Sequence, residues 1–537
     1  MLDIKINKIK VYTGALVVLL AFSSCEDLVD EVPISEISPI AFYENNDELL
    51  AGVVGAYDGM QGTYSEKTFF WGEFRSDNHQ PFEGGQAQQN NLEIVNNDIT
   101  QGNPGARWDR FYFMIDRANQ VIRNAPNVPS LDESLLAEAL AIRAKAYFDA
   151  IRVWGDVPLF TEPVQVLADA TKPVTDANTI MNEVIIPDML RAEELIVPLA
   201  DDFRFSKSSI YCLQAEVYMW LNDYAKAKEV LDAMIALGEH SLVTTPEAWD
   251  EMFYNNPPLA AFTDGLGKIQ EGSELIFSIR YDFEEERDAP QGYPNRTRWN
   301  RSGIMGLFYA GIPSYVISEE VENKWREKFP IVDSLWTEKY PDTDPVLTRT
   351  VLVDDGMGNI TEEEVPVYGD WRYYFTRQGR VEGFESVEIG EARTAKWQQT
   401  NYNRNDDDTD IVIYRYAGML LLLAEAENQL GNDARALELV NQIRTARQLP
   451  TVDAAEFGAT QEERLDYILD ERQLEMFGEG KRWWDLLRND KQYEVLNPIL
   501  ESRAEGVPLS EDRLVWPIHI DHLIENPLLN QNPGYIN

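Results

Sequence analysis

Three short segments of the chain combine aromatic rings with planar side chains that can hydrogen-bond. They are Trp71, Glu73, Arg75, Asp77 and Asn78; Arg298, Trp299, Asn300 and Arg301, with Phe308 and Tyr309 close behind; and Asp370, Trp371, Arg372, Tyr373 and Tyr374. An aromatic face can cover the apolar face of a sugar ring, while guanidinium, carboxylate and amide groups hold its hydroxyls. The segments therefore predict a carbohydrate-binding site. The competing interpretation of each is a buried aromatic residue beside a paired charge.

Trp299 is the strongest candidate among these rings. It stands between Arg298 and the pair Asn300-Arg301, in a stretch rich in Gly, Pro and Asn that does not suit a helix interior. Arginine side chains seek water or an acidic partner, so this Trp is poorly suited to a dry core. We expect its ring to be partly exposed in a concave surface. The arginines of the three segments, namely Arg75, Arg298, Arg301 and Arg372, could also form a local basic pocket for sulfate or uronate groups.

Metal and catalytic chemistry receive weaker support. His519 and His522 could form half of a metal site, but no other His or Cys cluster completes it, and a solvated pair is the simpler interpretation. The acidic run Asn405–Asp410 could hold Ca²⁺, yet it lacks the spacing of a calcium-binding loop, which favours a solvated turn. With 92 Asp and Glu residues, carboxylate pairs are too easily found to indicate a glycosidase. We predict no metal, no cofactor and no catalytic residue.

The N-terminus carries the signal of an exported lipoprotein. Lys5, Lys8 and Lys10 precede an apolar run from Ala15 to Phe22, and Ser23-Ser24 lead to Cys25. The run is too short for an ordinary membrane-spanning helix, and small residues before a cysteine are typical of a lipobox. We expect residues 1–24 to be a signal peptide and Cys25 to carry the lipid that anchors the protein to a membrane. A cleaved secretory signal with an incidental cysteine is the alternative.

The charge balance excludes one class of partner. The 537 residues include 47 Lys plus Arg against 92 Asp plus Glu, a net charge of −45. Nucleic acid requires a basic face and is therefore not expected as a partner. Anionic lipid would repel such a chain as well, so the lipid on Cys25 must provide the anchor. Cys212 is then the only remaining cysteine, and we expect a buried thiol without a disulfide.

The elements that must position these residues are mostly helices. Two segments 209 residues apart, beginning at Ala215 and Ala424, align without a gap. Each has an apolar helix, a turn at Asn-Asp or Gly-Asn and a second helix with Ala at close-packing positions, as in a tetratricopeptide hairpin. Further helices are predicted at Trp108–Arg123, Ser134–Trp154, Thr179–Ile196 and Glu462–Phe477, the last stopped by Gly478 and Gly480. From about residue 238 to 410 the helical period is broken, which predicts loops with short strands such as Leu275–Ile279.

Four separated motifs carry a resemblance that covers nearly the whole chain. They are Ala139–Leu159 (ALAIRAKAYFDAIRVWGDVPL), Tyr414–Gln429 (YRYAGMLLLLAEAENQ), Asp470–Arg488 (DERQLEMFGEGKRWWDLLR) and Trp516–Tyr535 (WPIHIDHLIENPLLNQNPGY). With their order, their spacing and the lipobox, the chain resembles the SusD/RagB nutrient-binding lipoproteins of Bacteroidetes. The departures are small, with His519 where Pro is usual and Gly418 where an acidic residue is common.

The resemblance implies a mostly α fold. Tetratricopeptide-like helical hairpins would form a scaffold at about 40–237 and 411–537, with a loop-rich, ligand-binding insert carrying short strands at about 238–410, all within one domain from 25 to 537. Sites in this family commonly draw on a loop in the first hundred or so residues and on the central region. The residues we expect to contact ligand are Trp71, Arg75, Asp77, Asn78, Arg298, Trp299, Arg301 and Tyr309, with Trp371 as a further candidate.

The resemblance also implies a function. The protein would be a non-catalytic lipoprotein of the outer membrane, facing outward, that captures an oligosaccharide or polysaccharide and delivers it to a partner, a SusC-like TonB-dependent transporter. Three alternatives stay open: a peptide-binding member of the same family, a helical glycoside hydrolase and a helical scaffold that binds only protein. Within the third motif, Arg482, Trp483, Trp484 and Asp485 are interpreted as a buried aromatic cluster with an ion pair, a structural feature rather than a binding site.

Overall fold

The computed structural model describes residues 42–65, 67–82, 89–197, 201–253, 270–281, 315–354, 356–357, 359–377, 387–397 and 409–536. Several sequence predictions fall outside these ranges. They concern the signal segment and Cys25, the cluster of Arg298, Trp299, Arg301 and Tyr309, and most of the run Asn405–Asp410.

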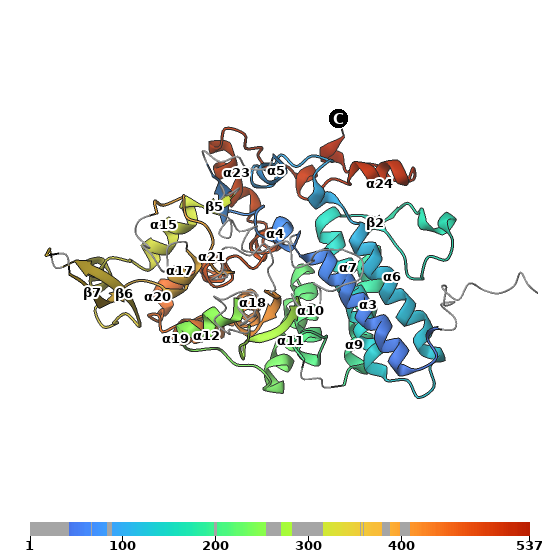
Figure 1. The fold of residues 1–537 in the computed structure, drawn as a ribbon, viewed down its shortest axis with the longest axis horizontal. Helices are drawn as coiled ribbons and strands as arrows, with labels where there is room; N and C mark the ends of the chain where they lie inside the picture. The colour runs from blue at the N-terminus through green and yellow to red at the C-terminus, as the bar shows by residue number, and fades with distance from the viewer. Residues whose placement is uncertain are drawn as a thin grey trace, which may run out of the picture.

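Helices make up most of the described chain, as the resemblance implies (Figure 1). In the first half they are α3 (Asn46–Tyr64), α4 (Lys67–Gly72), α5 (Gln89–Val95), α6 (Asp109–Asn124), α7 (Glu133–Trp154), α8 (Ala177–Ile180), α9 (Ile186–Leu195), α10 (Lys207–Trp220), α11 (Tyr224–Leu237) and α12 (Pro246–Asp250). In the second half they are α15 (Glu319–Lys328), α16 (Asp333–Lys339), α17 (Trp371–Thr376), α18 (Tyr416–Gln429), α19 (Asp433–Ala446), α20 (Ala454–Phe457), α21 (Gln461–Glu475), α22 (Arg482–Arg488), α23 (Gln492–Ser502) and α24 (Ile520–Glu525).

The long helices pack in pairs that give the scaffold its tetratricopeptide-like character. Helix α3 contacts α6, α7 contacts α9, α10 contacts α11, and α18 contacts α19. The two repeated segments of the sequence form the last two pairs, and each turns through a residue with positive φ at the same position, Asn222 (57°) and Gly431 (78°). Helix α11 also contacts α18. The N-terminal and C-terminal helices therefore form one continuous scaffold, visible in the lower part of Figure 1.

The individual helix predictions are confirmed, with their ends shifted by one or two residues. Trp108–Arg123 became α6, Ser134–Trp154 became α7, and Glu462–Phe477 became α21. Side chains at the N-caps explain two of the starts, because Asp132 accepts the Ser134 N–H and Thr460 forms a capping box with Glu463. The predicted helix at Thr179–Ile196 is interrupted by a π-helical turn, Met181–Ile185, between α8 and α9.

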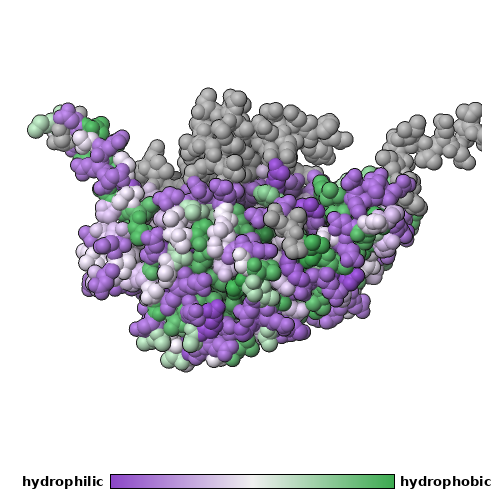
Figure 2. Space-filling view, turned by 90° about the horizontal axis from the view of Figure 1, so that it is seen from below, coloured by the Kyte–Doolittle hydropathy of each residue, from purple (hydrophilic) through white to green (hydrophobic). Residues whose placement is uncertain are grey.

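The middle of the chain is more regular than the sequence predicted. Leu275–Ile279 is strand β4, as expected, and it pairs with β8 (Ile411–Arg415). Helices α15, α16 and α17 also lie in this region. A long hairpin of β6 (Leu347–Asp354) and β7 (Ile360–Val367) projects from the left end of the molecule in both views (Figures 1 and 2). Over the face seen in Figure 2, polar and apolar residues are interspersed.

Two further pairs of short strands complete the described sheets. Strand β1 (His79–Pro81) pairs with β5 (Tyr315–Ile317), and β2 (Val157–Pro158) pairs with β3 (Val174–Thr175). All four sheets in the described ranges are two-stranded and antiparallel. One hydrophobic cluster includes residues from Ala56 to Tyr535, among them Val157 of β2 and Tyr315 and Ile317 of β5, and it connects these two strands to both halves of the scaffold.

Candidate functional site

Trp71, the first predicted platform for a sugar, lies in the interior. It belongs to α4, is only 2% exposed, and its indole N–H donates to the Gly105 carbonyl at 3.0 Å. Its ring packs against Phe111 and Trp154 at centroid distances of 5.2 and 5.6 Å. The expectation of an exposed loop position is therefore corrected. Apolar residues at helical spacing bury this segment against α6 and α7.

The polar residues that follow Trp71 are buried as well, and each has a protein partner. Arg75 donates to the Leu514 carbonyl at 2.7 Å and stacks over Trp483, 4.3 Å from the ring centroid. Asp77 pairs with Arg482, and the Asn78 amide donates to Glu73 at 2.6 Å. These contacts hold the segment after α4 against the C-terminal part of the chain. The segment is therefore a set of paired charges beside a buried ring, which was the competing interpretation of its sequence.

Trp371, the further candidate, is also enclosed. It begins α17, is 2% exposed, and donates its indole N–H to the Arg447 carbonyl at 2.7 Å. Arg372 is fully buried between Asp370, Glu471 and Glu475. Neither Arg75 nor Arg372 is therefore available for the basic pocket that the sequence suggested, since both guanidinium groups are used inside the protein.

The histidine pair of the C-terminal motif requires another correction. His519 and His522 are buried, not solvated. His522 stacks on Trp108 with the rings 5.1 Å apart and inclined by 13°, and its Nε2 accepts the Trp108 backbone N–H at 3.1 Å. Burial is the main cause that lowers the pKa of His522 to about 4. The ring is thus a neutral packing and capping element. Among the described residues, no group of three or more His, Cys, Asp or Glu side chains is placed to hold a metal ion.

Other structural predictions are confirmed. Cys212 is fully buried, and burial raises the pKa of its thiol well above the usual value. In the third motif Trp483 is buried and Arg482 forms an ion pair, although its partner is Asp77 instead of Asp485. Asp485 pairs with Arg472 at 2.8 Å and with Arg488.

A groove between α3 and β4 is the described cavity that best suits a single sugar ring. Its volume is about 250 Å³. The residues that line it are Val54, Tyr57, Asp58, Met60 and Gln61 of α3, Phe203 of the loop before α10, and Phe277, Ser278, Ile279 and Arg280 of β4 and its end. After Tyr281 the chain enters the segment 282–314, which carries the Trp299 cluster and lies outside the described residues. In sequence, the last residues of the groove therefore come just before the segment that carries Trp299, the strongest candidate predicted from the sequence.

The groove offers a ring and hydrogen-bonding groups side by side. Phe203 is half-buried and the exposed Arg280 guanidinium lies 5.9 Å from its ring centroid. The Gln61 amide donates to the Arg280 carbonyl at 2.5 Å, and the Tyr281 hydroxyl donates to the Gln61 carbonyl at 2.7 Å. These bonds fix the end of β4 against α3, and the exposed Arg280 forms part of the groove lining.

One wall of the groove is held by a buried polar contact. The Tyr57 hydroxyl donates to Glu138 at 2.8 Å and accepts the Phe205 N–H at 2.7 Å, while Arg204 forms an ion pair with the same carboxylate. Burial, with Glu138 as a second cause, raises the pKa of Tyr57 well above its usual value. Tyr57 is thus a neutral, fixed wall of the groove.

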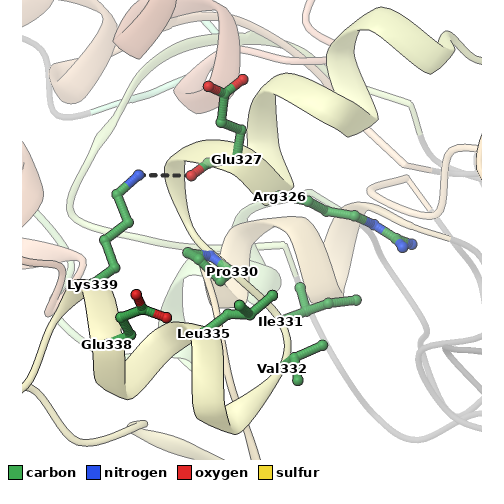
Figure 3. A pocket seen from close by; sticks show the side chains of 8 residues that line it. All are labelled: Arg326, Glu327, Pro330, Ile331, Val332, Leu335, Glu338 and Lys339. Carbon is green, nitrogen blue, oxygen red and sulfur yellow. Dashed lines mark hydrogen bonds between the residues drawn. The ribbon is translucent and has the colours of Figure 1, made fainter.

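A larger pocket lies between α15 and α16 and has a different character (Figure 3). Its volume is about 590 Å³. Pro330, Ile331, Val332 and Leu335 form an apolar floor, and charged side chains of both signs stand at its rim, namely Arg326, Glu327, Glu338 and Lys339. Lys339 donates to the Glu327 carbonyl at 2.6 Å. No aromatic ring lines this pocket among the residues described, so it lacks a stacking surface for sugar.

The site residues predicted from the sequence do not include Gln61, Phe203 or Arg280. A signal for one of them was present, because Phe203-Arg204-Phe205 repeats the aromatic–arginine pattern that selected the other clusters. Arg280 and Gln61 carried no local signal, since they meet only when β4 packs against α3.

No described helix is long and apolar enough to span a bilayer.

Models of two protein families match the two halves of the chain. Residues 273–535 match the model of the SusD family, and residues 30–219 match a model described as "Starch-binding associating with outer membrane". Among curated proteins, SusD-like protein P38 of Formosa agariphila is 38% identical over 539 residues, covering 99% of this chain and 100% of the relative. SusD-like protein P2 of the same organism is 26% identical, with 97% and 98% covered.

Solved structures share the fold. NanU of B. fragilis is 22% identical and aligns with a TM-score of 0.65, covering 94% of this chain and 99% of that one. A laminarin-binding SusD-like protein is also 22% identical, with a TM-score of 0.65 and coverage of 92% and 100%. A SusD superfamily protein from Bacteroides thetaiotaomicron reaches a TM-score of 0.67 at 18% identity, with 91% and 100% covered. At these identities the structures establish the fold and not the ligand.

Proposed function

Because this chain belongs to the SusD family, we propose that it is a non-catalytic, cell-surface protein that captures an oligosaccharide or polysaccharide. Two of the matches support a glycan as the ligand: one family model is described as starch-binding, and one protein of similar structure binds laminarin. Delivery to a SusC-like TonB-dependent transporter is part of the same proposal. The lipid on Cys25 would anchor the protein to the outer membrane, facing outward.

The α3–β4 groove is the observation that carries the proposal to particular residues. Phe203 offers a ring face, and the Arg280 guanidinium beside it offers planar N–H donors for neighbouring hydroxyls. The volume of about 250 Å³ is close to the lower limit of small-molecule sites, which suits one sugar unit of a longer chain. We propose that Trp299, with Arg298, Arg301 and Tyr309, extends this binding surface.

The groove argues against the alternative of a glycoside hydrolase. Hydrolysis of a glycosidic bond normally requires two carboxyl groups on either side of the bond. Asp58 is the one carboxylate among the described residues that line the groove. Elsewhere, buried carboxylates such as Asp77, Glu471 and Glu475 are engaged in ion pairs, which suits structural roles.

Peptide cargo is the second candidate function, and the pocket between α15 and α16 favours it. An apolar floor with a rim of both charges fits an aliphatic side chain of a peptide better than a sugar (Figure 3). The two cargoes would therefore use different cavities of the same protein.

Affinity electrophoresis and calorimetric titration against neutral glycans, uronate-containing or sulfated glycans, and peptide mixtures test the proposal. We expect retardation in at least one glycan gel with no shortening of the glycan after prolonged incubation. Release of reducing ends would establish the hydrolase instead. Binding of peptides alone, lost on Leu335→Asp in the larger pocket, would establish the peptide-binding member.

A further inference from the structure

A small polar cavity in the middle of the scaffold is lined by more positive than negative charge. It has a volume of about 30 Å³ and lies between α4, α7, β8 and α22. Lys145 and Arg152 of α7 and Lys481 before α22 contribute three cationic side chains to its wall. Their side chains are no more than 12% exposed. Three cations are thus held in a place where water can do little to solvate them.

Only two carboxylates pair with these three cations among the residues described. Asp149 pairs with Lys145 at 2.9 Å and also with Arg152, and Glu216 of α10 pairs with Lys481 at 2.8 Å. The two carboxylates are themselves buried. Among the described residues, one of the three positive charges therefore has no carboxylate of its own, and burial of an unpaired charge is unfavourable.

Glu479 also lines the cavity, but its charge is already used. It belongs to a second set of ion-paired groups. Among the described residues, every salt bridge of this set joins two of its members, and five cations face five carboxylates. The members are Lys328, Arg372, Lys396, Arg415 and Arg447, with Glu274, Asp370, Glu471, Glu475 and Glu479. That set is balanced and leaves no negative charge for the cavity.

Glu73 is the nearby carboxylate outside both sets. It accepts the backbone N–H groups of Gly478 and Gly480, each at 2.9 Å, and the Asn78 amide, and it forms no ion pair with Lys or Arg in the described chain. Burial raises the pKa of Glu73 to about 7. In the described chain it pairs with none of the three cations of the cavity.

Arg152 provides a second observation that points to a ligand. Its side chain is 7% exposed, and its Nε is buried without a hydrogen-bond partner in the described chain. The guanidinium lies over the rings of Phe148 and Trp484, with centroid distances of 4.0 and 4.7 Å. The ammonium groups of Lys145 and Lys481 each carry three N–H donors, and each has one carboxylate partner. Donors thus remain for an acceptor inside the cavity.

We infer that this cavity binds one small monovalent anion of the halide class, with chloride as the available example, as the counter-ion of Lys145, Arg152 and Lys481. The size of the cavity supports this class, because roughly 10–15 Å³ is needed for one water and about 30 Å³ leaves no space for sulfate or a sugar. The anion is a structural component that ties α7 to the loop before α22.

Bromide provides the direct test. Crystals of the wild-type protein grown or soaked in sodium bromide should show an anomalous peak in the cavity, within hydrogen-bond distance of Arg152 Nε. In solution, replacing gluconate by chloride at constant ionic strength should raise Tm by about 1–2 °C. A cavity with no anomalous peak and a Tm that is equal in both salts would overturn the inference, and water beside a neutral Lys145 would then fill the space.

Two matched variants separate an anion site from general salt effects. Lys145→Met leaves two cations and two carboxylates, so we expect its Tm in gluconate to equal or exceed that of wild type and its response to chloride to disappear. Lys328→Met removes a cation from the balanced set, so its Tm should fall in both salts while the chloride response stays. A Lys145→Met variant that still gains Tm from chloride would contradict the assignment.

Discussion

Arg482 and Asp77 form a bidentate ion pair across 405 positions of sequence, with Nε–Oδ1 and Nη2–Oδ2 distances of 2.8 and 3.0 Å. Both side chains are 5% exposed. Gln473 of α21 donates to the same carboxylate at 2.8 Å. The segment after α4 is thereby fastened to the C-terminal helices. From the sequence, Asp77 was expected to contact ligand and Arg482 to belong to a structural motif, whereas in the structure the two residues are partners.

Asp77→Asn should destabilise the protein by about 3–5 kcal/mol, because it leaves the Arg482 charge buried without a carboxylate. Urea unfolding at pH 7 measures the change. Asp109→Asn is the control, since it removes one carboxylate from an exposed pair with Arg107 and should cost less than about 1 kcal/mol. Equal losses for the two variants would contradict the structural role.

The same pair predicts a pH dependence. Burial alone would raise the pKa of Asp77, but Arg482, Lys324 and Gln473 together lower it from 3.8 to about 2. A carboxyl with a depressed pKa in the folded state contributes stability above the unfolded pKa, and loses it as the pH falls toward the folded one. Wild type should therefore lose roughly 2 kcal/mol from this group between about pH 5 and pH 1. Asp77→Asn should lack that part of the acid destabilisation.

Trp484→Ala should reduce stability without selectively removing ligand binding. The ring is half-buried, lies over Arg152 and meets Trp220 edge-on at 6.4 Å. Because part of the ring contacts solvent, we expect a loss of about 2–3 kcal/mol, below the value for a fully buried Trp. Thermal unfolding and glycan titration on the same preparation provide the measurement. A variant of normal stability that had lost all binding would refute this interpretation.

Phe203→Ala tests the α3–β4 groove. We expect at least fivefold weaker glycan binding, about 1 kcal/mol, because the ring face beside Arg280 is removed. Phe113→Ala is the matched control, since Phe113 is 37% exposed on α6 and also carries an arginine, Arg117, over its ring at 4.8 Å. Titration calorimetry should give an unchanged Kd for the control. If both variants bind as wild type does, the groove is not the site.

Trp299→Ala addresses the segment outside the described residues. We predict at least tenfold weaker glycan binding, about 1.4 kcal/mol, with little change in Tm. The reason is the neighbourhood of Arg298, Asn300 and Arg301, which suits a stacking platform better than a dry core. A large drop in Tm together with unchanged binding would mark the ring as core. A double variant that also carries Phe203→Ala tests whether the two rings contact the same ligand, because the losses in binding free energy would then not add independently.

Cys25→Ala should release the protein from the membrane. The motive is the lipobox before Cys25, which predicts a lipid on that residue. Incorporation of labelled fatty acid and membrane fractionation provide the readout, with Cys212→Ala as the control because that thiol is fully buried. Full membrane association of the Cys25 variant, with no lipid on the wild type, would show that the anchor lies elsewhere.

The sequence by itself determined the helical scaffold and the family. Apolar residues at helical spacing, capping residues such as Asp132 and Thr460, and the turns at Asn222 and Gly431 all act over a few neighbouring positions. Interactions of that range can be read from a linear pattern, which is why α6, α7 and α21 were predicted within one or two residues of their ends.

Only the tertiary structure decided which aromatic residues are buried. Trp71 and Trp371 have neighbours of the same types as an exposed platform would have, with arginines, acids and tyrosines beside them. Their burial depends on partners such as Gly105 and Arg447, which lie 34 and 76 positions away. A local pattern cannot distinguish an arginine that meets a ligand from one that meets a distant carboxylate, because the side chain is the same in both cases. The groove residues Gln61 and Arg280 lie 219 positions apart and were brought together by the same kind of long-range packing.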